Sequence, residues 1–211
     1  HSVALLMTIC VVSLIAFSLS HAAVFGDFEY RDNGTTITIT GYNGTGGDII
    51  IPETIDGKPV TEIGSRSFEN KVKTPSTLTL PSTLTTIGWE AFRGCSGFTG
   101  SLTIPEGVTI IGFNAFRDCM GFTGSLVIPE GVTTIGDDIF NNCAGFDGTL
   151  TLPSTLRRIG KFAFSDCSGF TGSLIIPDGV TTIGGWAFGH CSSFTGSLTI
   201  PEGVTTIGFG A

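Results

Sequence analysis

Basic side chains are scarce in this 211-residue chain, and they never cluster. Lys and Arg together number 10 against 18 Asp and Glu, which leaves a formal net charge of −8. A protein that tracks nucleic-acid phosphates needs a basic stripe, so the composition argues against a nucleic-acid partner. Charged residues make up only 13% of the chain and apolar residues 41%, which is not the profile of a disordered protein.

Cysteines are too few and too regularly placed for a disulfide framework. Cys10 lies in an apolar leader, and the other five recur one per repeat: Cys95, Cys119, Cys143, Cys167 and Cys191. An odd number cannot pair completely within one chain, and a linear row cannot surround a metal ion tetrahedrally. We therefore predict a ladder of buried thiols that act as small hydrophobic groups, with no metal site. An occasional disulfide between neighbouring coils remains the alternative.

A constellation of catalytic groups is missing as well. No nucleophile, base and orienting residue stand at positions that depart from the repeat. Gly44-Thr-Gly-Gly47 is not followed by a helix pattern, so it does not read as a phosphate loop. The sequence predicts no enzymatic activity, no catalytic residue and no cofactor.

No charged residue precedes Asp27, and residues 3–19 are almost wholly apolar. Ser20-His21-Ala22 fits the small-x-small rule of signal peptidase. We therefore predict a signal peptide over residues 1–22. Because the chain opens on His1, either the start of this peptide is truncated or translation begins at Met7. An uncleaved membrane anchor is the alternative, since the uncharged run is long enough to span a bilayer. Both readings place the remaining chain outside the cytoplasm.

What the chain has in abundance is a strict 24-residue period. An Ile-Gly pair recurs at Ile63, Ile87, Ile111, Ile135, Ile159, Ile183 and Ile207. A fixed period of this length predicts a solenoid of stacked coils, each sharing its interior with its neighbours. In the coil that starts at Phe98, Leu102 and Ile104 alternate with Ser101 and Thr103. This is strand spacing, so we expect one strand per coil in a parallel sheet.

The second half of each coil follows the Ile-Gly pair. Ala115, Phe116 and Cys119 recur at the spacing of one helical turn, which predicts a short helix or 3₁₀ turn. The glycine is present in all seven coils, so we expect either a positive φ or a close backbone approach there. One column of stacked rings is predicted from the phenylalanines at the same position: Phe92, Phe116, Phe140, Phe164 and Phe188.

The ends of the repeat region are irregular. A turn and an alternating strand precede the first coil, and we interpret them as a cap for its apolar layer. The first coil has five extra residues at its first corner, which predicts a wider turn. The chain stops at Ala211 without a polar cap, so we expect a fragment. The predicted organisation is a leader over 1–22, a cap over 23–48 and repeats over 49–211, truncated at the C-terminus.

The corner that follows each strand is acidic in most coils. Four carboxylates stand at equivalent positions there: Glu106, Glu130, Asp178 and Glu202. Their charges lie one coil apart and repel one another. We therefore predict solvated turn residues rather than a cation site.

The repeat resembles the BspA-like leucine-rich repeat, also called the Treponema-type repeat, with the pattern L-x-I-P-x-x-V-x-x-I-G-x-x-A-F-x-x-C. The matching residues in one coil are Leu102, Ile104, Pro105, Val108, Ile111, Gly112, Ala115, Phe116 and Cys119. Coils over 78–211 fit, and the coil at 49–68 fits loosely, with Ser67 at the Ala position and Lys71 at the Cys position. The resemblance implies a right-handed leucine-rich-repeat-like stack with a parallel sheet on one face and short helical or 3₁₀ turns on the other.

The resemblance also implies a function. Members of the family look like secreted or cell-surface proteins that bind host matrix proteins or other cells. We therefore expect an adhesin-like module that binds host matrix or other cell-surface proteins, or a glycan, on a host or neighbouring cell. Attachment to a membrane would then come only from the leader or a missing C-terminal anchor. The alternative is a passive spacer stalk of a larger surface protein. The positions after the Ile-Gly pair vary most, and four aromatic residues there are candidates for partner binding: Trp89, Phe113, Phe162 and Trp186. Packing against adjacent coils is the alternative for these rings.

Overall fold

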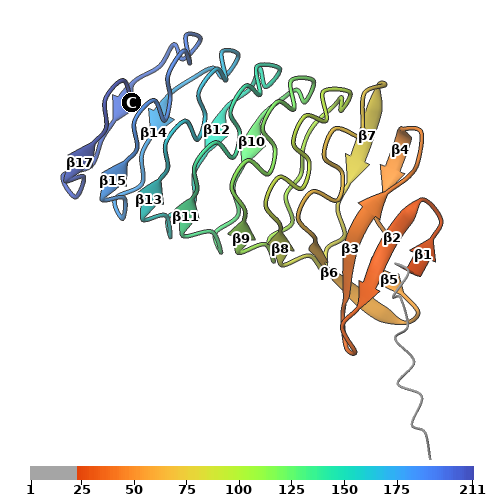
Figure 1. The fold of residues 1–211 in the computed structure, drawn as a ribbon. Coiled ribbons are helices and arrows are strands. Elements are labelled where there is room, and N and C mark those ends of the chain that lie inside the picture. Colours follow the sequence, from red (N-terminus) through yellow and green to blue (C-terminus); the bar gives the residue numbers. More distant parts are fainter. Residues whose placement is uncertain (1–22) are drawn as a thin grey trace, which may run out of the picture.

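A computed structural model describes residues 23–211, so the predicted leader over 1–22 lies outside the described residues. The described chain forms an elongated stack of coils, with each coil beside the next (Figure 1). Residues one period apart are paired neighbours: Ile87 pairs with Ile111, and Ile159 with Ile183. The predicted solenoid of 24-residue coils is confirmed.

Three antiparallel strands come before the first regular coil, in the segment predicted as a cap. They are β1 (Ala23–Phe25), β2 (Phe28–Asp32) and β3 (Ile37–Tyr42). The rings of Phe28 and Tyr42 lie 6.3 and 5.0 Å from the ring of Phe68, which belongs to the first coil. These strands therefore cover the apolar interior at the N-terminal end of the stack.

The five extra residues of the first coil form a hairpin. It joins β5 (Thr54–Ile55) to β6 (Lys58–Ile63). The two residues between them, Asp56 and Gly57, have φ angles of 51° and 73°. Positive φ at both central residues is what a two-residue type I′ hairpin turn requires, and the Asp-Gly pair supplies it.

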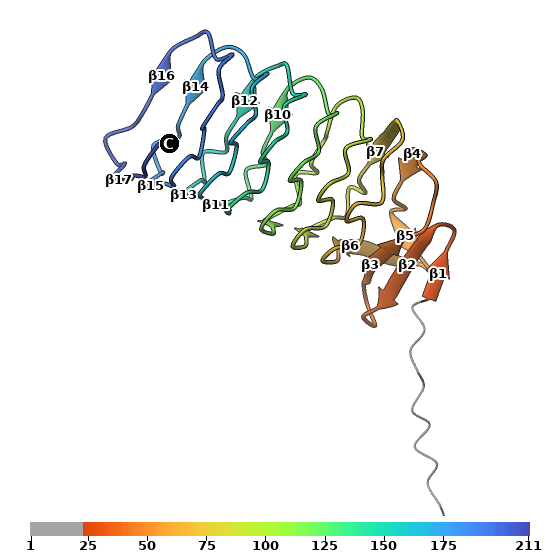
Figure 2. The ribbon, with the colours of Figure 1, turned by 45° about the horizontal axis from the view of Figure 1, so that its top comes forward.

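Two parallel ladders of strands run along the stack, where the sequence predicted one (Figures 1 and 2). The first, which we call the Leu ladder, uses the Leu-x-Ile segments and their Ile-x-Ile and Leu-x-Leu equivalents: β4 (Gly47–Ile50), β7 (Ser76–Thr79), β10 (Leu126–Val127), β12 (Leu150–Thr151), β14 (Leu174–Ile175) and β16 (Leu198–Thr199). The second, the Ile-Gly ladder, continues from β6 through β8 (Thr86–Ile87), β9 (Ile110–Ile111), β11 (Thr134–Ile135), β13 (Arg158–Ile159), β15 (Thr182–Ile183) and β17 (Thr206–Ile207). The parallel pairing is as predicted, but the restriction of strands to one face is wrong.

The predicted helical or 3₁₀ turns are also wrong. The N–H groups of Ala115, Arg117 and Cys119 donate to carbonyl oxygens three residues earlier, at 3.1–3.2 Å. The N–H of Phe116, which lies between them, donates to the carbonyl oxygen of Ile139 in the next coil, at 2.9 Å. A 3₁₀ helix needs every N–H to bond within its own segment. In this segment only alternate N–H groups bond within it, and the groups between them donate to the next coil. The segment is therefore a series of β-turns that is hydrogen-bonded to the next coil.

Left-handed residues explain why this segment does not become helical. Asn114 and Asp118 have φ angles of 57° and 62°, and the equivalent positions are also left-handed in the other coils between residues 66 and 190. Such residues do not continue a right-handed helix. The glycine of the Ile-Gly pair does not have a positive φ. Of the two predicted reasons for this glycine, the close approach of another coil's backbone therefore applies. A Cβ on Gly184 would lie 2.5 Å from backbone atoms of Gly160 and Lys161.

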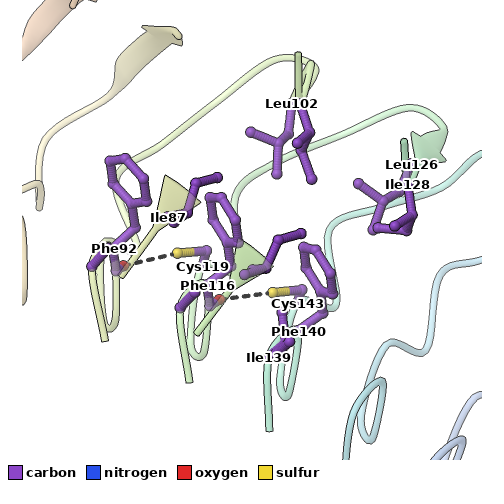
Figure 3. Packing of buried hydrophobic residues seen from close by; sticks show 14 of the residues in the cluster. Ile87, Phe92, Leu102, Phe116, Cys119, Leu126, Ile128, Ile139, Phe140 and Cys143 are labelled. Atoms are coloured by element: carbon purple, nitrogen blue, oxygen red, sulfur yellow. Dashed lines mark hydrogen bonds between the residues drawn. The ribbon is translucent and has the colours of Figure 1, made fainter. Parts of the chain in front are cut away.

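The core consists of columns that run the length of the stack. Consecutive rings of one column have centroids 5.2–5.5 Å apart: Phe92, Phe116, Phe140, Phe164 and Phe188. A second column has spacings of 5.1–6.1 Å: Phe98, Phe122, Phe146, Phe170 and Phe194. Figure 3 shows the thiols of Cys119 and Cys143 pointing at backbone oxygens of the preceding coil. Burying each ring contributes about 1.5–3 kcal/mol, so the columns make a large apolar contribution to the stability of the stack.

Candidate functional site

The four candidate aromatic residues occupy two different positions of the repeat. Trp89 and Phe113 directly follow the glycine of the Ile-Gly pair, whereas Phe162 and Trp186 stand one residue later. Between the two pairs lies a coil with two aspartates at these positions. The fold therefore arranges the candidates as two pairs and not as one patch of four.

The first pair has a third apolar neighbour that sequence reasoning missed. The exposed fractions of Trp89, Phe113 and Ile110 are 43%, 55% and 58%. Ile110 stands at an outward position of the Ile-Gly ladder that is threonine in most other coils, and this departure from the repeat was the available signal. We call Trp89, Ile110 and Phe113 the aromatic patch. Contiguous exposed apolar side chains are typical of interaction sites.

A hollow of about 330 Å³ lies beside the aromatic patch, with Ile110, Phe113, Gly136 and Arg158 in its lining. The ring of Phe113 is the nearest group to Gly136, 3.1 Å from the place where a Cβ would stand. At Gly112, the equivalent glycine one coil earlier, the nearest group is the backbone of the preceding coil, at 2.5 Å. The ring of Phe113 therefore occupies the space beside Gly136, whereas the backbone of the preceding coil occupies the equivalent space beside Gly112.

The Ile-Gly ladder is interrupted at this hollow. Within residues 23–211, β9 and β11 belong to separate sheets. The N–H of Gly112 donates to the carbonyl oxygen of Ile87 at 2.8 Å, and that of Gly160 to Ile135 at 2.7 Å. The corresponding bond from Gly136 does not form among the described residues. Backbone donors and acceptors need partners, so the interruption leaves such groups available beside exposed apolar side chains.

Trp89 is held in place by its neighbours. The guanidinium carbon of Arg66 lies 4.3 Å from the centroid of the indole ring, which is cation–π contact. The same guanidinium donates to a carboxylate oxygen of Glu90 at 2.7 Å, and Arg93 donates to the other at 3.1 Å. Glu90 is 5% exposed, so this ion network is partly desolvated and well ordered. An aromatic side chain that is already ordered loses little entropy when a partner binds.

The second pair is more deeply packed. The ring of Trp186 meets Phe209 edge-on at 5.8 Å and stacks on His190 at 5.8 Å. Phe162 is 38% exposed. Both members of the pair are left-handed, with φ angles of 53° and 57°, which is uncommon for bulky residues. The alternative prediction for these positions is packing against adjacent coils. This packing describes Trp186 better than it describes Trp89.

The cysteine ladder offers no reactive thiolate. The five thiols lie 2.9–3.1 Å from carbonyl oxygens of the preceding coil. Burial raises the pKa of the Cys95 thiol to about 11 and that of Cys191 to about 12. A nucleophilic cysteine needs a lowered pKa and access to solvent. The ladder is therefore structural in the described part of the chain.

Residues 23–211 lack two further features. No group of three or more His, Cys, Asp or Glu side chains is placed to hold a metal ion. No helix in this range has the length and hydropathy to cross a bilayer.

Comparison with known proteins identifies the repeat. The sequence profile of the BspA type leucine rich repeat region matches residues 61–171 and 122–211, in six copies. A leucine rich repeat protein of T. pallidum is similar in structure, with a TM-score of 0.77 and 30% identity over 89% of this chain and 86% of that one. No curated protein matches the chain.

Two other solved structures are similar over most of the chain. A leucine rich cell surface protein of Faecalibacterium prausnitzii has a TM-score of 0.61 and 29% identity, covering 83% of this chain and 54% of that one. A leucine-rich repeat protein of Bacteroides ovatus has a TM-score of 0.56 and 23% identity, covering 89% and 61%, and shows the fold alone. Repeats of this kind are non-enzymatic scaffolds for interactions between proteins. This chain belongs to the BspA-type leucine-rich repeat family.

Proposed function

We propose that the chain is a secreted or cell-surface interaction module that binds a protein of a host or neighbouring cell through the aromatic patch. The observation that carries this proposal is the exposure of Trp89, Ile110 and Phe113, at 43–58%, around an interruption of the Ile-Gly ladder. The cell-surface description of the F. prausnitzii relative supports the location.

The chemistry of the aromatic patch favours a protein partner. Tryptophan and other aromatic residues are enriched at the centres of protein interfaces, where they supply most of the binding energy. Backbone groups at the interrupted ladder add hydrogen-bonding capacity beside the apolar contact. A partner that places an apolar side chain in the hollow would cover the exposed faces of Ile110 and Phe113 together.

Binding to immobilised extracellular-matrix proteins tests the proposal. Surface plasmon resonance would compare the parent chain with the Trp89→Ala/Phe113→Ala double variant. We expect at least about a hundredfold loss of affinity, because two central aromatic residues at about 2 kcal/mol each contribute about 4 kcal/mol, and about 1.4 kcal/mol is a factor of ten. The Phe162→Ala variant is the matched control, since it removes a comparably exposed ring from another position of the repeat. Thermal unfolding would show that all variants are folded.

Other outcomes of the binding experiments would favour a different contact surface, a glycan partner or a passive stalk. Equal binding by the parent and the double variant would reject the aromatic patch as the contact. Binding to a glycan array that is lost in the double variant would make the partner a glycan. A parent chain that captures no protein and no glycan would favour the passive stalk.

A further inference from the structure

The Leu ladder contains two grooves that are repeated copies of one design. The heptapeptide Leu-Thr-Leu-Pro-Ser-Thr-Leu occurs over 78–84 and again, without change, over 150–156, three coils later. After each copy the ladder is interrupted. β7 pairs with β4, but the next coil has no strand over 101–104. In the same way β12 pairs with β10 and β14 pairs with β16, while β12 and β14 lie in separate sheets.

Each interruption opens a groove with an apolar floor and hydroxyl-bearing walls. The first groove has a volume of about 810 Å³, with Leu78 and Leu80 in its lining beside Thr103. The second has a volume of about 490 Å³, with Leu150 and Leu152 at the places of the two leucines and Ile175 at the place of Thr103. Neither lining includes a Lys or Arg. The grooves are separate from the aromatic patch, which lies on the Ile-Gly ladder.

Two carboxylates flank the serine of the heptapeptide in each groove. In the second groove Glu130 accepts hydrogen bonds from the backbone N–H and the hydroxyl of Ser154, at 2.9 and 2.8 Å. In the first groove Glu53 accepts the same two bonds from Ser82, at 2.8 and 3.0 Å. These bonds lower the pKa of both carboxyl groups. One side of each groove therefore carries a fixed negative charge.

The opposite side of each groove carries a carboxylate that is not engaged. Glu106 in the first groove and Asp178 in the second form no side-chain hydrogen bond or ion pair with residues 23–211. At equivalent corners of three successive coils the residues are acidic, Ser and acidic in both grooves. The carboxylate without a partner always belongs to the coil that follows the ladder interruption. A free carboxylate opposite a fixed one over an apolar floor has the chemistry to receive a cation with an aliphatic stem.

The side of the stack that holds the grooves has an uncompensated negative charge. No Lys or Arg occurs in the segments that run from the second phenylalanine column to the corner valine: 98–108, 122–132, 146–156, 170–180 and 194–204. Arg157 lies just outside the third segment, where its guanidinium donates to the carbonyl oxygen of Leu156 at 3.1 Å and lies near Gly179. The corner of the second groove therefore has a guanidinium beside it.

We propose that the two grooves together bind an extended basic segment of a partner protein, with one Lys or Arg side chain entering each groove between its two carboxylates. The spacing of the grooves fixes the spacing of the cations. Three coils at about 4.8 Å each separate the grooves by about 14 Å, which an extended chain covers in about four residues. The partner segment thus carries basic residues at positions i and i+4. Occupying both grooves at once raises the affinity above that of either groove alone.

Fluorescence anisotropy with a labelled peptide tests this proposal. The probe is an end-blocked peptide, Ser-Lys-Ala-Thr-Ala-Lys-Ser, in which the two lysines stand at positions i and i+4. The comparison peptides move the lysines to i and i+2 or replace both with glutamate. We expect the i, i+4 peptide to bind most tightly, with an affinity that falls as salt is added. Equal affinity for the two lysine peptides would overturn the assigned geometry.

Single-charge variants separate the grooves from general attraction. Glu106→Gln removes the open carboxylate of the first groove, and Glu202→Gln removes the same charge from an equivalent corner that lines neither groove. We expect about a tenfold loss for Glu106→Gln and little change for Glu202→Gln. Arg157→Ala should strengthen binding. Equal losses at both glutamates would reject the proposal in favour of nonspecific charge attraction. The Trp89→Ala/Phe113→Ala variant should bind the peptide normally, so failure at the aromatic patch and failure at the grooves are distinguishable.

Discussion

The thiol of Cys119 donates a hydrogen bond to the carbonyl oxygen of Phe92, and the two atoms lie 3.1 Å apart. The cysteine belongs to one coil and the phenylalanine to the coil before it. The same bond joins Cys143 to Phe116 at 3.0 Å. Each thiol is therefore both an apolar filler of the core and a donor that links adjacent layers. This double role accounts for one cysteine per coil without any disulfide.

The thiol ladder predicts a loss of stability at high pH. The folded chain raises the pKa of Cys95 from its ordinary value of 9.0 to about 11. The folded state therefore retains a proton that the unfolded state releases. The stabilisation is complete below pH 9 and is lost as the pH rises through 11. Urea denaturation between pH 7 and 11 should show the decline, and Cys95→Ala should make it shallower.

The reactivity of the five thiols tests whether they are buried as the structure shows. Cys191 is the one partly exposed thiol among the five, and the others are buried. In the native protein a disulfide reagent such as DTNB should therefore modify Cys191 first. The remaining thiols should react only at the rate of unfolding. Rapid modification of Cys143 in the folded protein would contradict a closed core.

Phe140→Ala should be strongly destabilising. Phe140 is fully buried, and its ring centroid lies 5.3 and 5.5 Å from those of Phe116 and Phe164. Removing the ring leaves a cavity between two coils, which costs about 3–5 kcal/mol. Phe113→Ala is the control, because its ring is 55% exposed and its loss should change the free energy of unfolding by less than about 1 kcal/mol. Urea denaturation of the two variants measures the difference, and similar midpoints would refute the column as the source of stability.

Two glycines at the same position of the repeat should respond differently to a methyl group. In Gly184→Ala the new Cβ would lie 2.5 Å from backbone atoms of the preceding coil. Backbone cannot move aside without breaking the ladder, so we expect a cost of about 3 kcal/mol. In Gly136→Ala the nearest group is the Phe113 side chain at 3.1 Å, which can rotate. That variant should lose about 1 kcal/mol or less. Thermal unfolding of both would reveal whether the close approach or the glycine itself is required.

The corner carboxylates predict sensitivity to acid. Hydrogen bonds from Ser154 lower the pKa of Glu130 below its ordinary value. The folded state therefore favours the ionised form, and the stabilisation exists above the unfolded pKa and disappears as the pH falls through the folded pKa. Glu130→Gln should flatten the dependence of the melting temperature on pH between about 3 and 6. Ser154→Ala, which removes the hydroxyl that donates to Glu130 at 2.8 Å, should flatten the profile in part.

The candidate sites show where a sequence pattern stops being informative. Trp89 and Phe113 were predictable as variable positions in an otherwise uniform repeat. Ile110 was not selected, although it replaces the threonine that most other coils have at this position, because only the structure shows that it lies beside Phe113 at the hollow. The interruption of the Ile-Gly ladder beside Phe113 depends on how one ring packs against Gly136. The sequence alone does not predict that the two coils lose their hydrogen bonds at this point.

By itself, the sequence determined the length of the coil, the columns of Phe and Cys and the family, because a fixed 24-residue period forces like residues to stack. Only the tertiary structure decided that the turns are not helical and that strands form two ladders. It also decided where those ladders are interrupted. The physical reason is that these features depend on hydrogen bonds between coils. Phe116, for example, donates its N–H to Ile139 of the next coil and not to its own, and no local propensity records that choice.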